Sequence, residues 1–313
     1  MTRRAGLTLI ELLVVLTILV ALSGIALRST IGLEEQARFE ATQRTLEEVR
    51  AATIGLPSSR NEAGLPIVTG FVADVGRAPL KDALGASELW SRGALPSFGV
   101  YPATSTDPEV SLPFGWRGPY LLRKPGSDPT ADVLVDGWNA PLQFLDGAGL
   151  PVTDGGLFAR VRSAGGQTAP WNRELVIEVP APSYEAHVVV RVTLTGTVSN
   201  SSGRRLHLRL FAPNPTAAEP LALAPTSDGN ETVNAETVWR CDGSTTSYTW
   251  ILSSQDFDAA DLTHGARVVR AYLDDDTTPG PLDVSTYEKG DLRSVVLVGG
   301  NNPQVDVTLA VAP

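Results

Sequence analysis

The stretch GLTLIELLVVL at residues 6–16 decides the fold, because it opens a long apolar run that holds one carboxylate, Glu11. Residues 7–27 are almost entirely apolar, and a helix of that length spans roughly 30 Å, about the thickness of a hydrocarbon core. A carboxylate at the centre of such a helix costs roughly 2.5–3.5 kcal/mol even on lenient insertion scales. The position of Glu11 therefore calls for a specific explanation.

Two ordinary explanations of this run leave Glu11 unaccounted for. Arg3 and Arg4 precede the run, and the positive-inside tendency keeps them cytoplasmic and sends the rest of the chain outward. A secretory signal cut after Ser23 is one alternative, because residues 21–23 resemble a small-residue cleavage site. A plain signal anchor is the other alternative, and neither one requires a carboxylate near the start of the helix.

A cut after Gly6 would give Glu11 a partner. Such a cut creates a new amine at Leu7, one helical turn before Glu11, and the amine of a neighbouring copy could pair with the carboxylate. Residues 6–16 resemble the type IV prepilin signal of pilins and pseudopilins, with Leu7 where that family usually has Phe. The resemblance implies that prepilin peptidase cuts after Gly6 and N-methylates Leu7, and that Glu11 aligns subunits in a filament.

The N-terminal helix is predicted to continue well beyond the apolar run. No proline occurs before Pro57, and Phe39, Leu46, Val49 and Thr53 form a narrow apolar stripe at helical spacing. The sequence thus predicts a leader peptide at 1–6 and one helix at 7–54. The first part of that helix, 7–27, is predicted to be transmembrane.

Residues 55–170 are predicted to form a head in which a small antiparallel sheet covers the apolar stripe of the helix. The segments WRGPYL (116–121), DGWNAPLQF (136–144) and RSAGG (162–166) resemble the major pseudopilin of type II secretion, in the same order. Trp116 and Trp138 are interpreted as turn and core residues. Many pseudopilins bind Ca²⁺ in the last loop of this sheet, but the loop here has no Asp or Glu, so no cofactor or metal is expected.

Residues 174–313 are predicted to form a second unit, an antiparallel β-sandwich. An immunoglobulin-like strand arrangement is one option for this sandwich. Short alternating β-branched runs are separated by turn clusters, which is typical of that architecture. The fold class is therefore α+β, with a long helix, a pilin-like head and an all-β C-terminal region. Asp274, Asp275 and Asp276 are interpreted as a solvated turn, with a weak cation site as the alternative.

Composition and motifs exclude several functional classes. The net charge of −10 disfavours nucleic acid as a partner, and Cys241 is the lone cysteine. His187, His207 and His264 share no metal-ligand spacing, and the common hydrolase, nucleotide-binding and metalloprotease motifs are absent from the sequence. We therefore expect no enzymatic activity.

The resemblance implies a structural subunit of a type II secretion pseudopilus or a type IV pilus-like filament, serving protein secretion. Its partners would be prepilin peptidase, other pilin or pseudopilin subunits and the inner-membrane assembly platform. It would start as a single-pass protein of the bacterial inner membrane with a periplasmic C-terminus, and then enter a periplasmic or extracellular filament. The alternative is a minor, tip or membrane-anchored display protein whose β-sandwich binds a ligand or surface.

Overall fold

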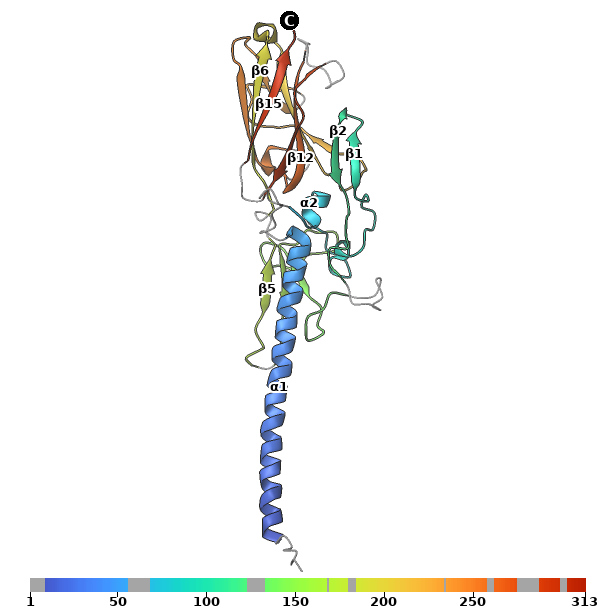
Figure 1. Cartoon of the computed structure of the whole chain (residues 1–313), viewed down its shortest axis with the longest axis vertical. Helices are drawn as coiled ribbons and strands as arrows, with labels where there is room; N and C mark the ends of the chain where they lie inside the picture. The colour runs from blue at the N-terminus through green and yellow to red at the C-terminus, as the bar shows by residue number, and fades with distance from the viewer. Residues whose placement is uncertain are drawn as a thin grey trace, which may run out of the picture.

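The computed structural model describes residues 9–55, 68–122, 133–167, 169–179, 184–233, 235–257, 262–274, 287–298 and 303–313, with residues 25–31 and 254 described by their backbone only. The molecule is elongated: a long helix forms one end, and the C-terminus lies in a β-rich region at the other end (Figure 1). Its class is α+β, as predicted from the sequence.

Helix α1 (Leu9–Ile54) runs without interruption for 46 residues. It ends at Gly55, which has a φ of 76° and donates its N–H to the carbonyl of Ala51 at 2.9 Å. Glycine adopts this left-handed conformation without steric cost, so it is a common residue at the end of a helix. The predicted stripe of Phe39, Leu46, Val49 and Thr53 is buried, which confirms the helical spacing from which it was inferred.

A small antiparallel sheet packs on the C-terminal part of α1, in the strand order β3-β4-β5. Its strands are β3 (Gln143–Leu145), β4 (Arg160–Ser163) and β5 (Leu175–Glu178). A turn follows β3, in which Gly149 donates its N–H to the carbonyl of Asp146 at 3.1 Å. The short helices α2 (Phe71–Val75) and η1 (Ser87–Leu89) complete this head, and its core includes Leu46, Val49, Phe71, Phe144 and Ile177.

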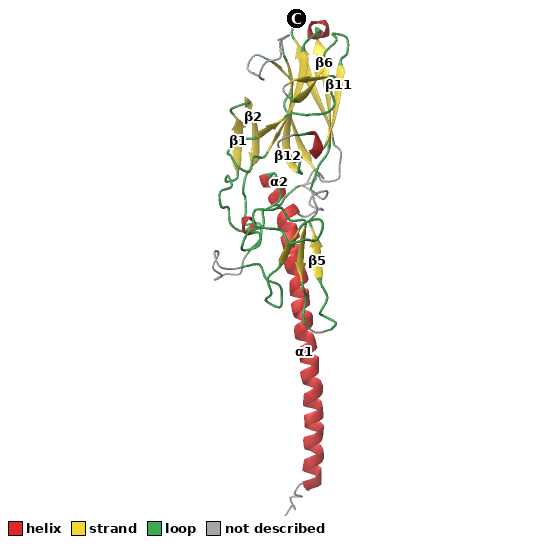
Figure 2. Ribbon diagram, turned by 180° about the vertical axis from the view of Figure 1, so that it is seen from behind, coloured by secondary structure: helices red, strands yellow, loops and turns green. Residues whose placement is uncertain are grey.

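The C-terminal region consists of two sheets that face each other across one core (Figure 2). The larger sheet has the path β13 (Glu288–Lys289), β12 (Gly265–Leu273), β7 (Arg205–Ala212), β10 (Glu236–Arg240) and β9 (Glu231–Val233); β14 (Arg293–Leu297) also pairs with β12, and β8 (Leu221–Leu223) with β7. The smaller sheet has the order β11 (Ser247–Leu252), β6 (Val188–Gly196) and β15 (Gln304–Val311). The short helices η3 (Val198–Ser201) and η4 (Ser254–Asp256) lie in its loops.

Every second side chain of the strands in both sheets enters this core, as the alternating β-branched runs of the sequence predicted. Val190 and Val192 of β6, Trp250 of β11 and Leu208 of β7 are completely buried. One pairing differs from the predicted all-antiparallel arrangement, because β15 runs parallel to β6 from Gln304 to Val311. The final strand thus returns to the sheet in the same direction as β6, which a pattern of alternating residues cannot reveal.

The structure also places two segments differently from the sequence analysis. Leu175–Glu178 was expected in the sandwich, but it pairs with Arg160–Ser163 in the head sheet. In the opposite sense, the hairpin of β1 (Gly99–Ala103) and β2 (Asp107–Phe114) comes from the predicted head and packs on β12 of the sandwich. The division into units at 55–170 and 174–313 stays a prediction.

Asp107 attaches this hairpin to the sandwich. Its Oδ2 accepts hydrogen bonds from Arg270 Nη1 at 2.7 Å and from the Tyr272 hydroxyl at 2.8 Å. Burial alone would raise the pKa of Asp107, but the Tyr272 hydrogen bond and the Arg270 charge outweigh it and lower that pKa. The carboxylate is therefore ionised and fully paired at the joint.

Asp274 corrects another expectation, because it does not lie in a solvated turn. The residue is buried, and its Oδ1 accepts the backbone N–H of Arg205 at 2.6 Å. The sequence suggested solvent because three aspartates occur together, whereas long-range pairing with β7 determines the position of the first one. Asp275 and Asp276 lie outside the described residues.

Candidate assembly site on the N-terminal helix

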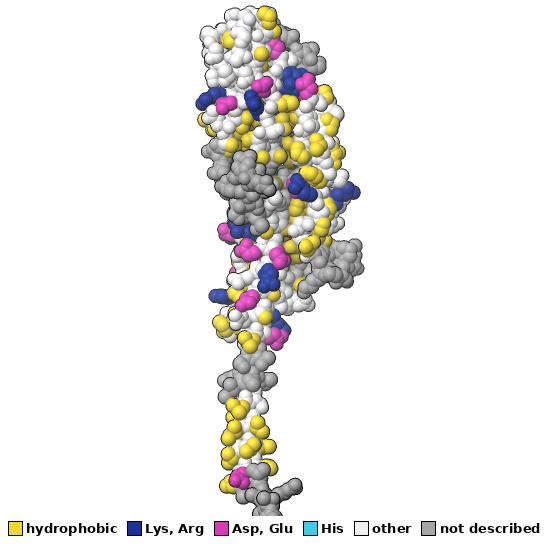
Figure 3. Space-filling model, viewed as in Figure 1, with side chains coloured by type: hydrophobic (Ala, Val, Ile, Leu, Met, Phe, Trp, Pro, Cys, Tyr) yellow, Lys and Arg dark blue, Asp and Glu magenta, His cyan; other side chains and the backbone are white. Residues whose placement is uncertain are grey.

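The N-terminal part of α1 projects from the head, and Figure 3 shows apolar side chains on the face in view. The exposed apolar residues follow one another almost without a break, so they cover all sides of the helix. The exposed fractions of these side chains range from 49% at Val14 to 84% at Leu9. They belong to Leu9, Ile10, Leu12, Leu13, Val14, Val15, Leu16, Ile18, Leu19, Val20 and Leu22. A helix that is apolar all round requires an apolar surrounding, since burying each such side chain is worth about 1.5–3 kcal/mol.

Glu11 is exposed among these side chains, in the first turn of the described helix. The predicted cleavage residue Gly6, the predicted methylation residue Leu7 and the leader residues Arg3 and Arg4 lie outside the described residues. The structure therefore does not test the predicted relation between Leu7 and Glu11, and the roles of these residues stay predictions.

Among the residues that the structure describes, no helix meets the length and apolarity required of a transmembrane span. The predicted span at 7–27 starts before the described part of α1, and it ends where α1 is described by its backbone only. It stays a prediction.

The exposed part of α1 ends where a turn of the head contacts the helix. Trp138 Nε1 donates to Glu35 Oε2 at 2.8 Å, and the Gly137 N–H donates to Thr42 Oγ1 at 2.8 Å. A Cβ on residue 137 would lie 2.1 Å from the carbonyl oxygen of Arg38, so glycine permits the backbone to approach the helix this closely. We call residues 136–138, together with 171–173, the collar.

Asp136 shapes the turn of the collar. Its Oδ1 accepts the backbone N–H groups of Trp138 and Ala140, each at 2.9 Å, which is an Asx-type turn. Its Oδ2 accepts the hydroxyl of Ser163 at 2.6 Å, and this bond attaches the turn to β4. Asp136 thus aligns the indole of Trp138 with the helix.

Aromatic contacts form the other part of the collar. The rings of Phe39 and Trp171 are 5.4 Å apart, and the Arg173 guanidinium lies 4.6 Å from the centroid of the Phe39 ring. Phe39 begins the buried stripe of α1, so the sequence predicted its burial but gave no sign of its partners. Trp138 and Trp116 pack as turn and core residues, as interpreted; Trp116 Nε1 donates to the Glu88 carbonyl at 2.7 Å.

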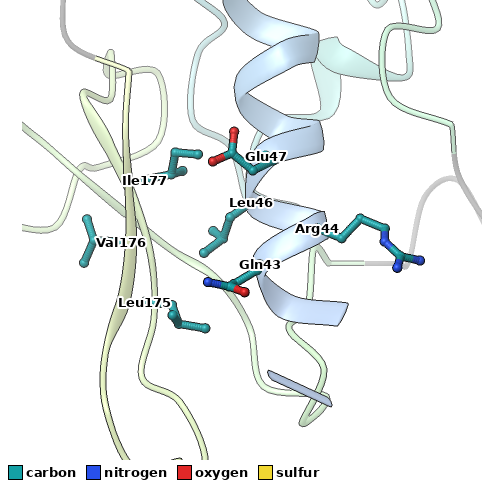
Figure 4. A pocket seen from close by; sticks show the side chains of 7 residues that line it. All are labelled: Gln43, Arg44, Leu46, Glu47, Leu175, Val176 and Ile177. Carbon is teal, nitrogen blue, oxygen red and sulfur yellow. The ribbon is translucent and has the colours of Figure 1, made fainter. Parts of the chain in front are cut away.

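A groove lies between α1 and the edge strand β5, on the part of α1 that follows the collar contacts. It has a volume of about 350 Å³ and is lined by Gln43, Arg44, Leu46, Glu47, Leu175, Val176 and Ile177. Figure 4 shows Gln43 and Leu46 directed towards β5 and Arg44 directed away from it. This lining is suited to packing and offers no arrangement of groups for acid–base chemistry.

The histidines are placed separately, as their spacing predicted. His207 lies between Glu236 and Asp274, with ring nitrogens 3.1 and 3.4 Å from their carboxylate oxygens. Burial opposes the charge of this imidazole, but the hydrogen bonds to Asp274 and Glu236 prevail and raise its pKa. Burial, together with the charge of Arg267, lowers the pKa of His264 to about 4.

No cluster of three or more potential metal ligands occurs within the described part of the chain. In the loop where many pseudopilins bind Ca²⁺, the Ser163 hydroxyl donates to the Asp136 carboxylate. Both carboxylate oxygens of Asp136 already accept hydrogen bonds within the head, so Asp136 does not supply the carboxylate that this loop lacks. The absence of a metal stays a prediction.

Comparison with known families identifies the class of the N-terminal segment. Residues 1–27 match the model of the prokaryotic N-terminal methylation motif. The chain therefore carries a prepilin-like signal, and this motif supports a type IV pilin-like protein that is processed by prepilin peptidase. The motif also implies assembly with other pilin-type subunits, and it does not distinguish a pilin from a pseudopilin. Searches of curated proteins and of solved structures found no significant match.

Proposed function

We propose that this protein is a structural subunit of a type II secretion pseudopilus or of a related type IV pilus-like filament. The observation that carries the proposal is the N-terminal part of α1, which is apolar on all sides and contains one carboxylate, Glu11. Its side chains can be buried in a bilayer before assembly and among the helices of other subunits afterwards. The protein acts by assembly and not by catalysis.

The proposed sequence of events starts in the inner membrane, with the C-terminal region in the periplasm. Prepilin peptidase cuts after Gly6 and methylates the new amine of Leu7. Glu11 then pairs with the amine of a neighbouring subunit, and the inner-membrane platform moves the helix into the filament. Pairing removes the cost of an isolated buried charge and sets the register between subunits.

The first test is the intact mass and N-terminal sequence of the protein from native membranes. A chain that starts at N-methyl-Leu7 is the expected result. A chain that keeps Met1 would indicate a plain anchor, and one that starts after Ser23 would indicate a secreted protein; either result would refute the proposal.

A minor or tip subunit is the second candidate, and the position of the sandwich favours it. The sandwich lies at the end of the molecule opposite the start of α1 (Figure 1), where it extends away from any bundle that α1 joins. The number of copies per filament separates the candidates: a major subunit is abundant along the filament, whereas a tip subunit is rare.

A further inference from the structure

A second cavity lies in the sandwich, beside the edge strand β11 and the end of β10. It has a volume of about 370 Å³ and is lined by Asn230, Trp239, Arg240, Asp242, Thr245, Ser247, Tyr248 and Thr249. Strand β11 forms one wall and has β6 as its neighbour on one side; on its other side, none of the described strands pairs with it. Figure 2 shows β11 at the margin of the sandwich beside β6. The volume is within the usual range for small-molecule sites.

Trp239 supplies the apolar surface of this cavity. The ring is partly buried against two other aromatic rings, 5.8 Å from Tyr248 and 6.3 Å from Trp250. Its indole nitrogen is buried and has no hydrogen-bond acceptor among the described residues, as is also true of Trp250 in the core, but the Trp239 residue lines the cavity. The cavity therefore contains a fixed aromatic ring, a group that is well suited to an apolar face of a ligand.

The polar part of the lining is already ordered without a ligand. Asn230 is fixed by two bonds to the backbone of Arg240, at 2.6 and 3.1 Å. Asp242 accepts the backbone N–H groups of Ser244 and Thr245, each at 2.7 Å, and these bonds lower its pKa, so it is ionised. Arg240 and Asp242 together give the lining a balanced charge, which favours a neutral ligand over an anion or a cation.

Ser247 and Thr249 alternate along β11 with the core residues Tyr248 and Trp250, so their hydroxyls lie at the outer rim of the cavity. Within the described residues, the side chains of Ser247 and Thr249 make no hydrogen bond, and both line the cavity. Ser247 is exposed and Thr249 is partly exposed. Hydroxyls of this kind both donate and accept, so they match a ligand that itself carries hydroxyl groups.

The free edge of β11 is capped at both ends, which argues against an added peptide strand. At one end the Ile251 N–H, on the open edge of β11, donates to Asp228 Oδ2 at 2.6 Å. At the other end the turn that Asp242 organises precedes the strand. A capped edge of this length restricts strand pairing, and the space between the caps suits a compact ligand.

We propose that this cavity binds a neutral saccharide of one or two rings. The C–H face of a sugar ring packs on Trp239, and its hydroxyls exchange hydrogen bonds with Ser247, Thr249 and the polar rim. This activity is separate from assembly and requires neither Leu7 nor Glu11.

The test is saturation-transfer difference NMR on the full-length protein in lauryldimethylamine oxide, a detergent without a sugar group. Maltose, cellobiose and di-N-acetylchitobiose serve as probes at about 10 mM, a range that detects weak binding. An array of neutral glycans widens the search, and an unstructured Ser/Thr-rich peptide tests strand addition.

Thr249→Arg fills the cavity from its rim without removing a core side chain. Thr308→Arg is the matched control, since Thr308 is a partly exposed threonine of β15 in the same sheet.

We expect at least one neutral sugar to bind, at least about tenfold weaker binding by Thr249→Arg, and unchanged binding by Thr308→Arg. Trp239→Leu should also abolish the signal, with far-ultraviolet circular dichroism verifying its fold. Absence of binding to every neutral glycan, equal binding by Thr249→Arg, or binding of the peptide alone would overturn the proposal.

Discussion

The two parts of α1 have the same secondary structure and opposite surroundings. Up to Leu22 the apolar side chains point in all directions and are at least about half exposed, whereas from Phe39 onward one buried stripe faces the head. The collar marks the start of the covered part, at Glu35 and Thr42. Helical structure alone thus does not reveal what a helix packs against; the angular distribution of its apolar residues does.

This difference indicates where each part obtains its stability. The covered part is stabilised within its own chain, by the head sheet and the collar. The exposed part must obtain a comparable gain from outside the chain, in a membrane or among other copies. A change in the exposed part should therefore alter assembly, while a change in the covered part should alter the stability of the single chain.

The largest expected effect follows from Glu11→Ala. This variant should still insert into the membrane but should not enter filaments, because the neighbouring amine loses its partner inside an apolar bundle. Immunoblots of sheared filaments and of membrane fractions measure the two quantities separately.

Glu34→Ala is the matched control, because Glu34 is also in α1 but pairs with Arg38 on an exposed surface. It should assemble normally, since exposed pairs at this spacing contribute only about 0.3–0.5 kcal/mol. Normal incorporation of Glu11→Ala would show that the exposed part assembles by apolar contact alone.

The second effect compares one apolar truncation in each part of α1. Phe39→Ala should lower the free energy of unfolding by about 3 kcal/mol, because it removes a buried ring from Trp171 and Arg173. Leu16→Ala should leave that free energy unchanged, since Leu16 is 58% exposed in the single chain. Urea unfolding in detergent, followed by tryptophan fluorescence, measures both. Equal losses would contradict the proposed division of α1.

Much of this comparison could be predicted from the sequence. The length of α1 and its stripe follow from local rules: absence of proline, helical spacing and a glycine at the end. The collar could not be predicted, because the contact of Gly137 with Arg38 joins residues far apart in the chain. Trp138 was interpreted as a turn or core residue, but nothing in the sequence indicated that its turn would face Glu35.

The β-rich region illustrates the same limit. Alternation identified most of its strands, but the pairing partner of Leu175–Glu178 and the parallel direction of Gln304–Val311 depend on topology. The hairpin at Gly99–Phe114 was missed because Pro102, Pro108 and Pro113 interrupt its pattern. Prolines are tolerated there because β1 and β2 form a sheet of two strands only.

The third effect tests how closely the collar approaches α1. Gly137→Ala should destabilise the protein by about 3 kcal/mol, at the upper end for overpacking, because its Cβ would meet backbone atoms of Arg38 that cannot turn away. Gly147→Ala is the control in the same head, since no atom lies within 4 Å of a Cβ at that position. Thermal unfolding measures both, and a harmless Gly137→Ala would show that the collar does not restrain the helix.

The smallest effect comes from acid, which should lower the free energy of unfolding of the folded regions beyond α1. The helical structure of the exposed part of α1 should not change. His264 is neutral in the folded chain, because burial lowers its pKa from the usual 6.5 to about 4. The unfolded chain binds this proton more readily, so stability is complete above pH 6.5 and decreases as the pH falls towards 4. At pH 5 the loss from this group is about 2 kcal/mol.

His264→Gln isolates this contribution, since the amide has no charge to gain between pH 7 and pH 5. The unfolding free energy of the variant should depend on pH less steeply than that of the natural chain, by about 2 kcal/mol over this interval. The helical signal of the exposed part in detergent should be the same at both pH values, because the side chains of this part other than Glu11 do not titrate. Identical pH dependence in the two proteins would show that His264 is already accessible to protons in the folded state.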